Sequence, residues 1–157
     1  MDLELSVIII ILLIGLLSVY VFYLIGIYIK LENRRSLILI KFTEVNNQIE
    51  NKLDLVKELN DILNNKTLEK ERIKLLNSIS VNDKIKNNKI LDSTLEDLPE
   101  LDKKAKKIMT KINNINEKIN YSKEFYNDTL YEYNIILSTK SGLLLKKLLK
   151  YTEYNTF

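Results

Sequence analysis

The sequence predicts an all-α protein with long helices, the first of which is long and apolar enough to cross a membrane. Three observations predict this class: an uncharged apolar run near the N-terminus, apolar residues at alternating spacings of three and four, and a near absence of turn-forming residues. After the apolar run, Gly142 is the one glycine, and Pro99 is the one proline of the 157-residue chain. A β-rich domain of this size would need many more turn residues, so helices are expected throughout.

The apolar run extends from Leu5 to Ile29 and reads LSVIIIILLIGLLSVYVFYLIGIYI. A helix of this length is about 37 Å long, more than the roughly 30 Å of hydrocarbon in a bilayer. A cleaved signal peptide would instead have a basic start, a shorter apolar stretch and small residues at its cleavage site. Here Asp2 and Glu4 precede the run and bulky residues follow it, so we expect a retained anchor.

Basic residues flank only the C-terminal end of the run, and they predict the topology. Positively charged flanks stay in the cytoplasm, so the N-terminus should face outward. The expected organisation is a short extracytoplasmic N-terminus (residues 1–4), a transmembrane helix (5–29) and a cytoplasmic helical domain (30–157) of a single-pass plasma-membrane protein. The topology-determining residues are Lys30, Arg34, Arg35 and Lys41.

Composition argues against several functions. The chain has no cysteine and no histidine, so disulfides, thiolate chemistry and the commonest general base and metal ligand are lacking. The formal net charge is only +3, and the basic residues are interspersed with acidic ones, which does not favour nucleic-acid binding. We therefore expect a protein that is not an enzyme and that has no catalytic residues, cofactor, bound metal or nucleic-acid partner.

The first cytoplasmic helix is expected to continue straight out of the membrane. Asn64, Asn65 and Lys66 either end this helix or only interrupt it, and residues 80–96 predict a short helix between two loops. The helix carries a heptad stripe with one charged member: Ile38, Phe42, Val45, Ile49, Lys52, Val56, Leu59 and Leu63. Four residues resume the stripe further on: Leu68, Leu75, Leu76 and Ile79.

The longest helix is predicted around and after Pro99. Asp97 is the expected N-cap, Pro99 lies in the first turn and Glu100 is three residues after the cap. Together with Glu96 and Asp102 these acids could bind Mg²⁺ or Ca²⁺, but carboxylates at a helix start are favoured by the helix dipole alone, so capping is preferred. The core stripe of this helix is Leu101, Ala105, Ile108, Ile112, Ile115, Ile119, Ser122, Tyr126, Thr129, Tyr133 and Ile136.

Gly142 either ends the long helix or starts a last short element, residues 143–151. On a helical wheel this element is amphipathic and basic. Docking of its leucine face on the rest of the protein is slightly preferred over contact with anionic lipid. Lys146, Lys147 and Lys150 cluster opposite Leu144, Leu145, Leu148 and Tyr151.

A series of short motifs follows the apolar run along the chain. They are Phe42, Val45, Gln48, Ile49 and Asp54-Leu55-Val56, then Leu98-Pro99-Glu100-Leu101, Ser122-Lys123, Tyr126-Asn127-Asp128, Tyr133-Asn134, Tyr151, Glu153 and Phe157. Their order resembles the LemA family of bacterial membrane proteins, and the sequence departs from the family pattern at Lys57, at Asn116 and at Lys140-Ser141. The resemblance implies an outward N-terminus, one membrane helix and an antiparallel four-helix bundle, and it implies no agreed biochemical activity.

Two features allow a functional and a structural interpretation. Tyr126-Asn127 and Tyr133-Asn134 lie seven residues apart and could form a recognition surface, but they continue a core stripe and are interpreted as a core layer. Lys52 could form a buried ion pair with an acid such as Glu117 or Glu124. We prefer a snorkelling side chain whose stem covers apolar surface.

The predicted function is a non-catalytic scaffolding or regulatory role of a membrane-tethered helical bundle that binds a membrane-protein partner at the cytoplasmic face. The alternative is a self-assembling coiled-coil protein of the cell envelope or division apparatus, which would be a homo-oligomer. Both follow from the anchor and the long amphipathic helices, and neither needs a catalytic residue.

Overall fold

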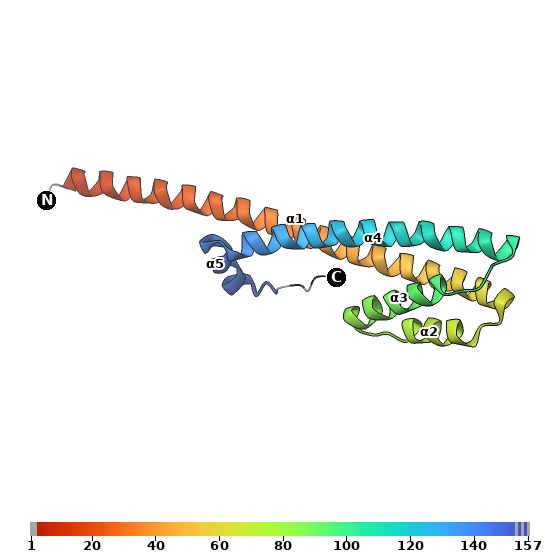
Figure 1. Cartoon of the computed structure of the whole chain (residues 1–157). Helices are drawn as coiled ribbons and strands as arrows, with labels where there is room; N and C mark the ends of the chain where they lie inside the picture. The colour runs from red at the N-terminus through yellow and green to blue at the C-terminus, as the bar shows by residue number, and fades with distance from the viewer. Residues whose placement is uncertain (1–2, 153, 155, 157) are drawn as a thin grey trace. The chain divides into compact units, whose positions relative to one another are not determined.

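The computed structural model describes residues 3–152, 154 and 156, apart from the side chains of Leu3, Glu4, Val81 and Asn82. All regular secondary structure in these residues is helical (Figure 1), so the all-α class is confirmed. The helices are α1 (Leu3–Leu63), α2 (Lys66–Leu76), α3 (Val81–Glu96), α4 (Lys103–Ser138) and α5 (Lys140–Leu149).

Helix α1 contains the whole apolar run and continues without a break into the heptad stripe, as predicted. In the described part of the chain it is the one helix long and apolar enough to cross a membrane. Most side chains of the run are exposed, whereas Leu24 and Ile27 are half-buried. The sequence-based interpretation of residues 1 and 2 lies outside the described residues.

The chain divides into two compact units, and the division falls inside α1 and α4. Unit 1 contains α1 as far as Leu37 together with residues 129–154, and unit 2 contains residues 38–128. The boundary between the two units in α1 therefore lies after Leu37, eight residues beyond the end of the apolar run at Ile29.

In unit 2, α1 and α4 run antiparallel, because Lys41 lies above the Phe125 ring and Glu44 accepts a hydrogen bond from Ser122. Helices α2 and α3 pack against each other. The finer expectation of an antiparallel four-helix bundle with long helices is not confirmed, since α2 and α3 have only 11 and 16 residues. The buried core is Val45, Ile49, Leu53, Val56, Leu59, Leu68, Leu75, Leu91, Leu95, Ala105, Ile108, Ile112 and Ile119.

The turns between α1, α2 and α3 are made by polar residues. Asn64 adopts a left-handed conformation (φ 50°) that ends α1, and the side chain of Asn65 caps α2. Ser80 caps α3, which confirms the short helix expected in residues 80–96. Leu76 and Ile79 are exposed, so their assignment to the core stripe is wrong, because α2 ends there and the chain turns away.

The predicted N-cap of the long helix is also wrong. Asp97 is the C-cap of α3, and α4 begins at Lys103, where Asp102 Oδ1 accepts a 2.7 Å hydrogen bond from the Ala105 amide. Leu98 precedes the proline, a position that disfavours helical backbone. Leu98 and Leu101 instead pack against the core of unit 2 as part of a loop, and α4 begins only after this loop.

In unit 1, α5 follows α4 after a sharp turn. Thr139 caps α5, and its hydroxyl oxygen accepts a 3.0 Å hydrogen bond from the Gly142 amide. Gly142 therefore lies in the first turn of α5 rather than ending α4. A Cβ atom at this position would lie 1.9 Å from the Ile136 carbonyl oxygen, so the close approach requires glycine.

Candidate functional site

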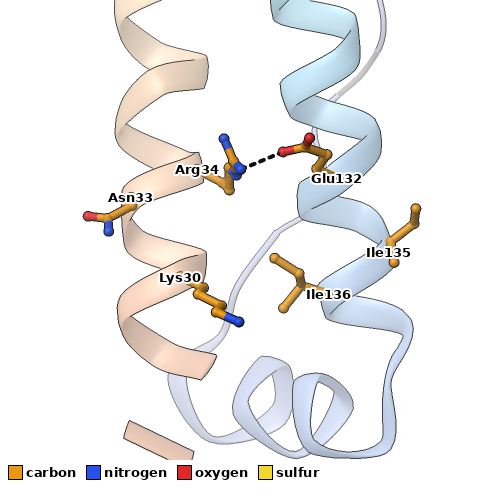
Figure 2. A pocket seen from close by; sticks show the side chains of 6 residues that line it. All are labelled: Lys30, Asn33, Arg34, Glu132, Ile135 and Ile136. Atoms are coloured by element: carbon orange, nitrogen blue, oxygen red, sulfur yellow. Dashed lines mark ion pairs between the residues drawn. The ribbon is translucent and has the colours of Figure 1, made fainter. Parts of the chain in front are cut away.

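The residues that follow the apolar run form a polar cluster in unit 1. Arg34 pairs with Glu132 of α4 at 2.8 Å (Figure 2), and Arg35 donates a 3.2 Å hydrogen bond to the Tyr154 hydroxyl. Lys30 forms no ion pair with any described residue. Of the three residues in this unit that are predicted to determine topology, Arg34 and Arg35 are thus held by the C-terminal part of the chain, whereas Lys30 pairs with no described residue.

Tyrosine side chains join the C-terminal segment to α1 and α4. The Tyr151 hydroxyl donates a 2.6 Å hydrogen bond to Glu32 Oε1, and the Arg35 guanidinium lies 6.0 Å from the centre of the Tyr151 ring. Burial, together with the adjacent Glu32 carboxylate, raises the pKa of Tyr151 far above its ordinary value, so the phenol remains a neutral donor. The Tyr133 hydroxyl donates to the Thr152 carbonyl at 3.2 Å.

A pocket of about 580 Å³ lies beside this cluster, open to solvent, and Figure 2 shows its lining. Lys30, Asn33 and Arg34 of α1 form one wall, and Glu132, Ile135 and Ile136 of α4 form the other. Because Glu132 neutralises Arg34, the ammonium group of Lys30 is the net charge on this wall. The pocket thus combines the ammonium group of Lys30 with the apolar side chains of Ile135 and Ile136.

A second polar cluster lies in unit 2, around Lys52. The Lys52 side chain is 0% exposed, and its ammonium group contacts Asp92 Oδ1 at 2.5 Å and Asn88 Oδ1 at 2.7 Å. Asn116 and Asn88 each donate a further hydrogen bond to the Asp92 carboxylate. The snorkelling interpretation of Lys52 is therefore wrong, because its ammonium group is buried and paired.

The alternative interpretation of Lys52 was correct in kind but not in partner. Glu117 and Glu124 are exposed, and the carboxylate comes from α3, whose sequence offered no clear stripe. Burial lowers the pKa of Lys52, and the adjacent Asp92 carboxylate partly offsets this effect. A cavity of about 200 Å³ adjoins the cluster, and the buried Asn116 Oδ1 has no protein partner among the described residues.

Both tyrosines of the paired Tyr-Asn motif are buried. Tyr126 is buried in unit 2 and Tyr133 in unit 1, as the core interpretation expects. Asn127 and Asn134 are half-buried. Lys41, the fourth residue that is predicted to determine topology, pairs with Glu44 at 2.7 Å in unit 2.

The remaining candidates are separated or only partly engaged. No three His, Cys, Asp or Glu side chains are grouped as metal ligands in the described part of the chain, and this includes the acids around Pro99. In α5, Leu145 is buried together with the following Tyr151, whereas Leu144 and Leu148 are exposed. Only half of the predicted leucine face is therefore docked.

Comparison with known proteins gives no match: no family model, no curated protein and no solved structure resembles this chain significantly. The resemblance to the LemA family consequently rests on the quoted residues alone.

Proposed function

We propose that the protein is a single-span membrane protein whose helical part is a non-catalytic scaffolding or regulatory module at the cytoplasmic face of the plasma membrane. The observation that carries this proposal is the continuity of α1. One helix of 61 residues contains first an uncharged run that fits a bilayer and then a stripe that fills the core of unit 2. The anchor and the module thus share a helix.

The proposed orientation is supported by the basic residues after the run. Lys30, Arg34, Arg35 and Lys41 all follow it, and no Lys or Arg precedes it. Short flanks rich in Lys and Arg remain cytoplasmic during insertion. The helical module, which follows these residues, is therefore assigned to the cytoplasm.

The non-catalytic role is supported by the composition of the two polar clusters. They contain carboxylates, amides, lysines, arginines and phenols, and the chain has no cysteine or histidine to act as a nucleophile or a base near neutral pH. The Asp92 carboxylate is occupied by Lys52 and two amides, and Glu32 by Tyr151. These groups stabilise contacts between helices.

Binding of a membrane-protein partner is favoured over self-assembly through the heptad stripe. Val45, Ile49 and Val56, the positions that a homotypic coiled coil would use, are buried within the chain. By contrast, Leu39 and Ile40 of α1 are exposed, 49% and 55%. They provide an apolar surface for another protein.

Cysteine crosslinking in intact membranes tests this proposal, because the chain has no cysteine of its own. Ile40→Cys should give a crosslinked product of one defined mass that contains a second protein, and Val45→Cys, the buried control, should give none. A homotypic dimer from Val45→Cys, Ile49→Cys or Val56→Cys would support self-assembly instead. The lack of any product from Ile40→Cys and from affinity capture in mild detergent would count against a partner.

The LemA assignment remains part of this proposal. It agrees with the anchor and with the helical class, and it adds no activity. Its Leu-Pro-Glu-Leu segment corresponds to the loop before α4, where Leu98 and Leu101 pack against the core.

A further inference from the structure

Helix α5 has an apolar ridge that is exposed in the described part of the chain. Leu145 and Gly142 face the interior of unit 1, whereas Leu144 and Leu148, four residues apart on the neighbouring side of the helix, are 38% and 66% exposed. The helix contains three lysines, counting its first residue, Lys140, and no acidic residue, and Lys150 follows at its C-cap. Exposed leucines on a basic amphipathic helix are typical of helices that lie in a membrane interface.

The contacts of unit 1 hold α5 at the end of the apolar run. Tyr151, two residues after α5 ends, is hydrogen-bonded to Glu32, which is three residues after Ile29. Figure 2 shows α5 beyond Lys30, next to the part of α1 that leads back to the run. The anchor residues Leu24 and Ile27 are half-buried, and residues 129–154 are the only other part of their unit.

The length of the apolar run indicates how deep in the bilayer α5 would lie. About 20 helical residues cross the hydrocarbon, so a span that starts at Leu5 reaches the far boundary near Leu24. Residues 25–29 then lie among the lipid headgroups. The segment that covers Leu24 and Ile27 is therefore at the boundary between acyl chains and headgroups.

We propose that α5 is a second membrane contact, an interfacial helix that binds the anionic lipid leaflet. Leu144 and Leu148 enter the acyl boundary, and Lys147 and Lys150 lie among the phosphates. Lys30, the unpaired cation of the adjacent pocket, faces the same headgroups. This inference rests on the proposed anchoring by α1.

The charge of α5 favours lipid over a second copy of the chain as the partner that covers the apolar ridge of Leu144 and Leu148. In a dimer formed through α5, the lysines of two helices without any carboxylate would face each other. An anionic leaflet instead attracts each lysine, and the anchor holds this leaflet at the depth of the ridge. A bilayer is thus the complementary surface.

The chain has no tryptophan, so single tryptophans report depth without background. The full chain is reconstituted in bilayers with brominated acyl chains, with and without phosphatidylglycerol. The variants are Leu148→Trp on the ridge, Leu13→Trp in the anchor and Ile79→Trp at a 97% exposed position of unit 2. Tryptophan quenching by the lipid is measured for each variant.

We expect strong quenching of Leu148→Trp and Leu13→Trp, no more than background quenching of Ile79→Trp, and an increase for Leu148→Trp when phosphatidylglycerol is added. Adding Lys147→Gln or Lys150→Gln should each weaken the docked state of α5 about fivefold on the anionic bilayer. Circular dichroism of each variant verifies that the helices are retained.

The outcomes separate this inference from the proposal on which it rests. If Leu13→Trp is quenched but Leu148→Trp behaves like Ile79→Trp, the anchor stands and α5 does not bind the membrane. If Leu148→Trp is quenched equally with and without anionic lipid, the lysines play no part and the proposed electrostatic contact is overturned. If Leu13→Trp is not quenched, the anchoring itself is refuted.

Discussion

At Lys52 the protein buries an ammonium group whose desolvation is offset by one carboxylate and one amide oxygen. The two partners are not equivalent, because the Lys52 side chain is fully buried while that of Asp92 is 30% exposed. Removing Asp92 leaves a buried charge without a counterion. Removing Lys52 leaves a partly hydrated carboxylate that still accepts hydrogen bonds from two asparagines.

We therefore predict that Asp92→Ala lowers the free energy of unfolding by about 3–5 kcal/mol, whereas Lys52→Met, which fills the same space with an apolar chain, costs far less. Urea unfolding of the full chain in detergent, followed by circular dichroism, measures both. Equal losses for the two variants would contradict the stated asymmetry, because they would mean that a buried Lys52 without its counterion costs no more than Asp92 without its cation.

The same pair predicts a pH dependence. Burial lowers the pKa of Lys52 below its unfolded value of 10.5, so between the two values the unfolded state binds more protons and stability rises with pH. The free energy of unfolding is thus highest with respect to Lys52 above pH 10.5, where the side chain is neutral in both states. This stability is lost as the pH falls through the pKa of Lys52 in the folded protein. The free energy of unfolding of the wild type relative to Lys52→Met should increase on approaching pH 10.5, and a flat difference would contradict the desolvation of Lys52.

Tyr133 tests the core interpretation of the Tyr-Asn motif. The ring is 0% exposed, so Tyr133→Ala should cost about 3–5 kcal/mol, and Tyr133→Phe, which removes the hydroxyl that donates to the Thr152 carbonyl, about 1 kcal/mol. Tyr131 on the same helix is 69% exposed, and Tyr131→Ala should change stability by less than about 0.5 kcal/mol. A stable Tyr133→Ala protein would return this residue to the candidates for a binding surface.

At the level of elements, two aspartates, Asp97 and Asp102, are alternative N-caps for α4. Asp102→Ala removes the acceptor of the Ala105 amide and should cost about 1 kcal/mol. Asp97 lies at the C-terminal end of α3, where its charge opposes the helix dipole, so Asp97→Ala should be neutral or slightly stabilising. Thermal melts of the two variants distinguish the positions, and a larger loss for Asp97→Ala would place the cap where the sequence first suggested.

The turn into α5 depends on Gly142. Gly142→Ala would force its new methyl group against the Ile136 carbonyl oxygen, a backbone atom that cannot move alone, so α5 must shift. We expect a loss of more than about 1 kcal/mol, with faster proteolysis after Lys146 or Lys147. Ser141→Ala, on the neighbouring half-buried residue, is the matched control and should leave the protease pattern unchanged.

The elements that could be predicted from sequence are those whose signal is periodic. The stripes of α1 and α4 could be predicted because burial repeats every three to four residues, whereas the end of α1 at Asn64 was only one of two interpretations of its polar segment. The partner of Lys52 was not, because Asp92 is 40 residues away in a polar helix with no stripe. The cap of α4 was missed because Asp97 and Asp102 both have the right chemistry, and only the packing of Leu98 and Leu101 decides between them.

Only part of the candidate site in unit 1 could be predicted from the sequence. The basic residues after the run were identified from their position, but Glu132, Tyr151 and Tyr154 are distant in sequence and carry no motif that links them to α1. The exposure of Leu144 and Leu148 could not be predicted from the sequence either, because a helical wheel places both residues on the same face as the buried Leu145.

For the whole molecule, topology is the property that any function depends on. A reporter that fluoresces only in the cytoplasm, fused after Phe157, should be active, because Lys30, Arg34, Arg35 and Lys41 follow the run and hold that side inside. Replacing all four by Gln, and adding two lysines before Leu3, should reduce or reverse this signal. Activity of only an extracytoplasmic reporter on the wild-type chain would refute the orientation and move the helical module outside.

The hydrogen bonds of Glu32 to Tyr151 and of Arg35 to Tyr154 each join residues 119 positions apart. At a synthesis rate of about 5–20 residues per second, the tyrosines are made roughly 6–24 s after the residues of α1 that they bind. By then the start of α1 has left the ribosome, and the face of α1 around Leu31, which is buried in the finished protein, is still uncovered. The last step in forming unit 1 is thus the search of the C-terminal segment for this face of α1, and under the proposed anchoring by α1 that search takes place at the membrane surface. It is expected to be slow, because contacts between residues distant in sequence form slowly.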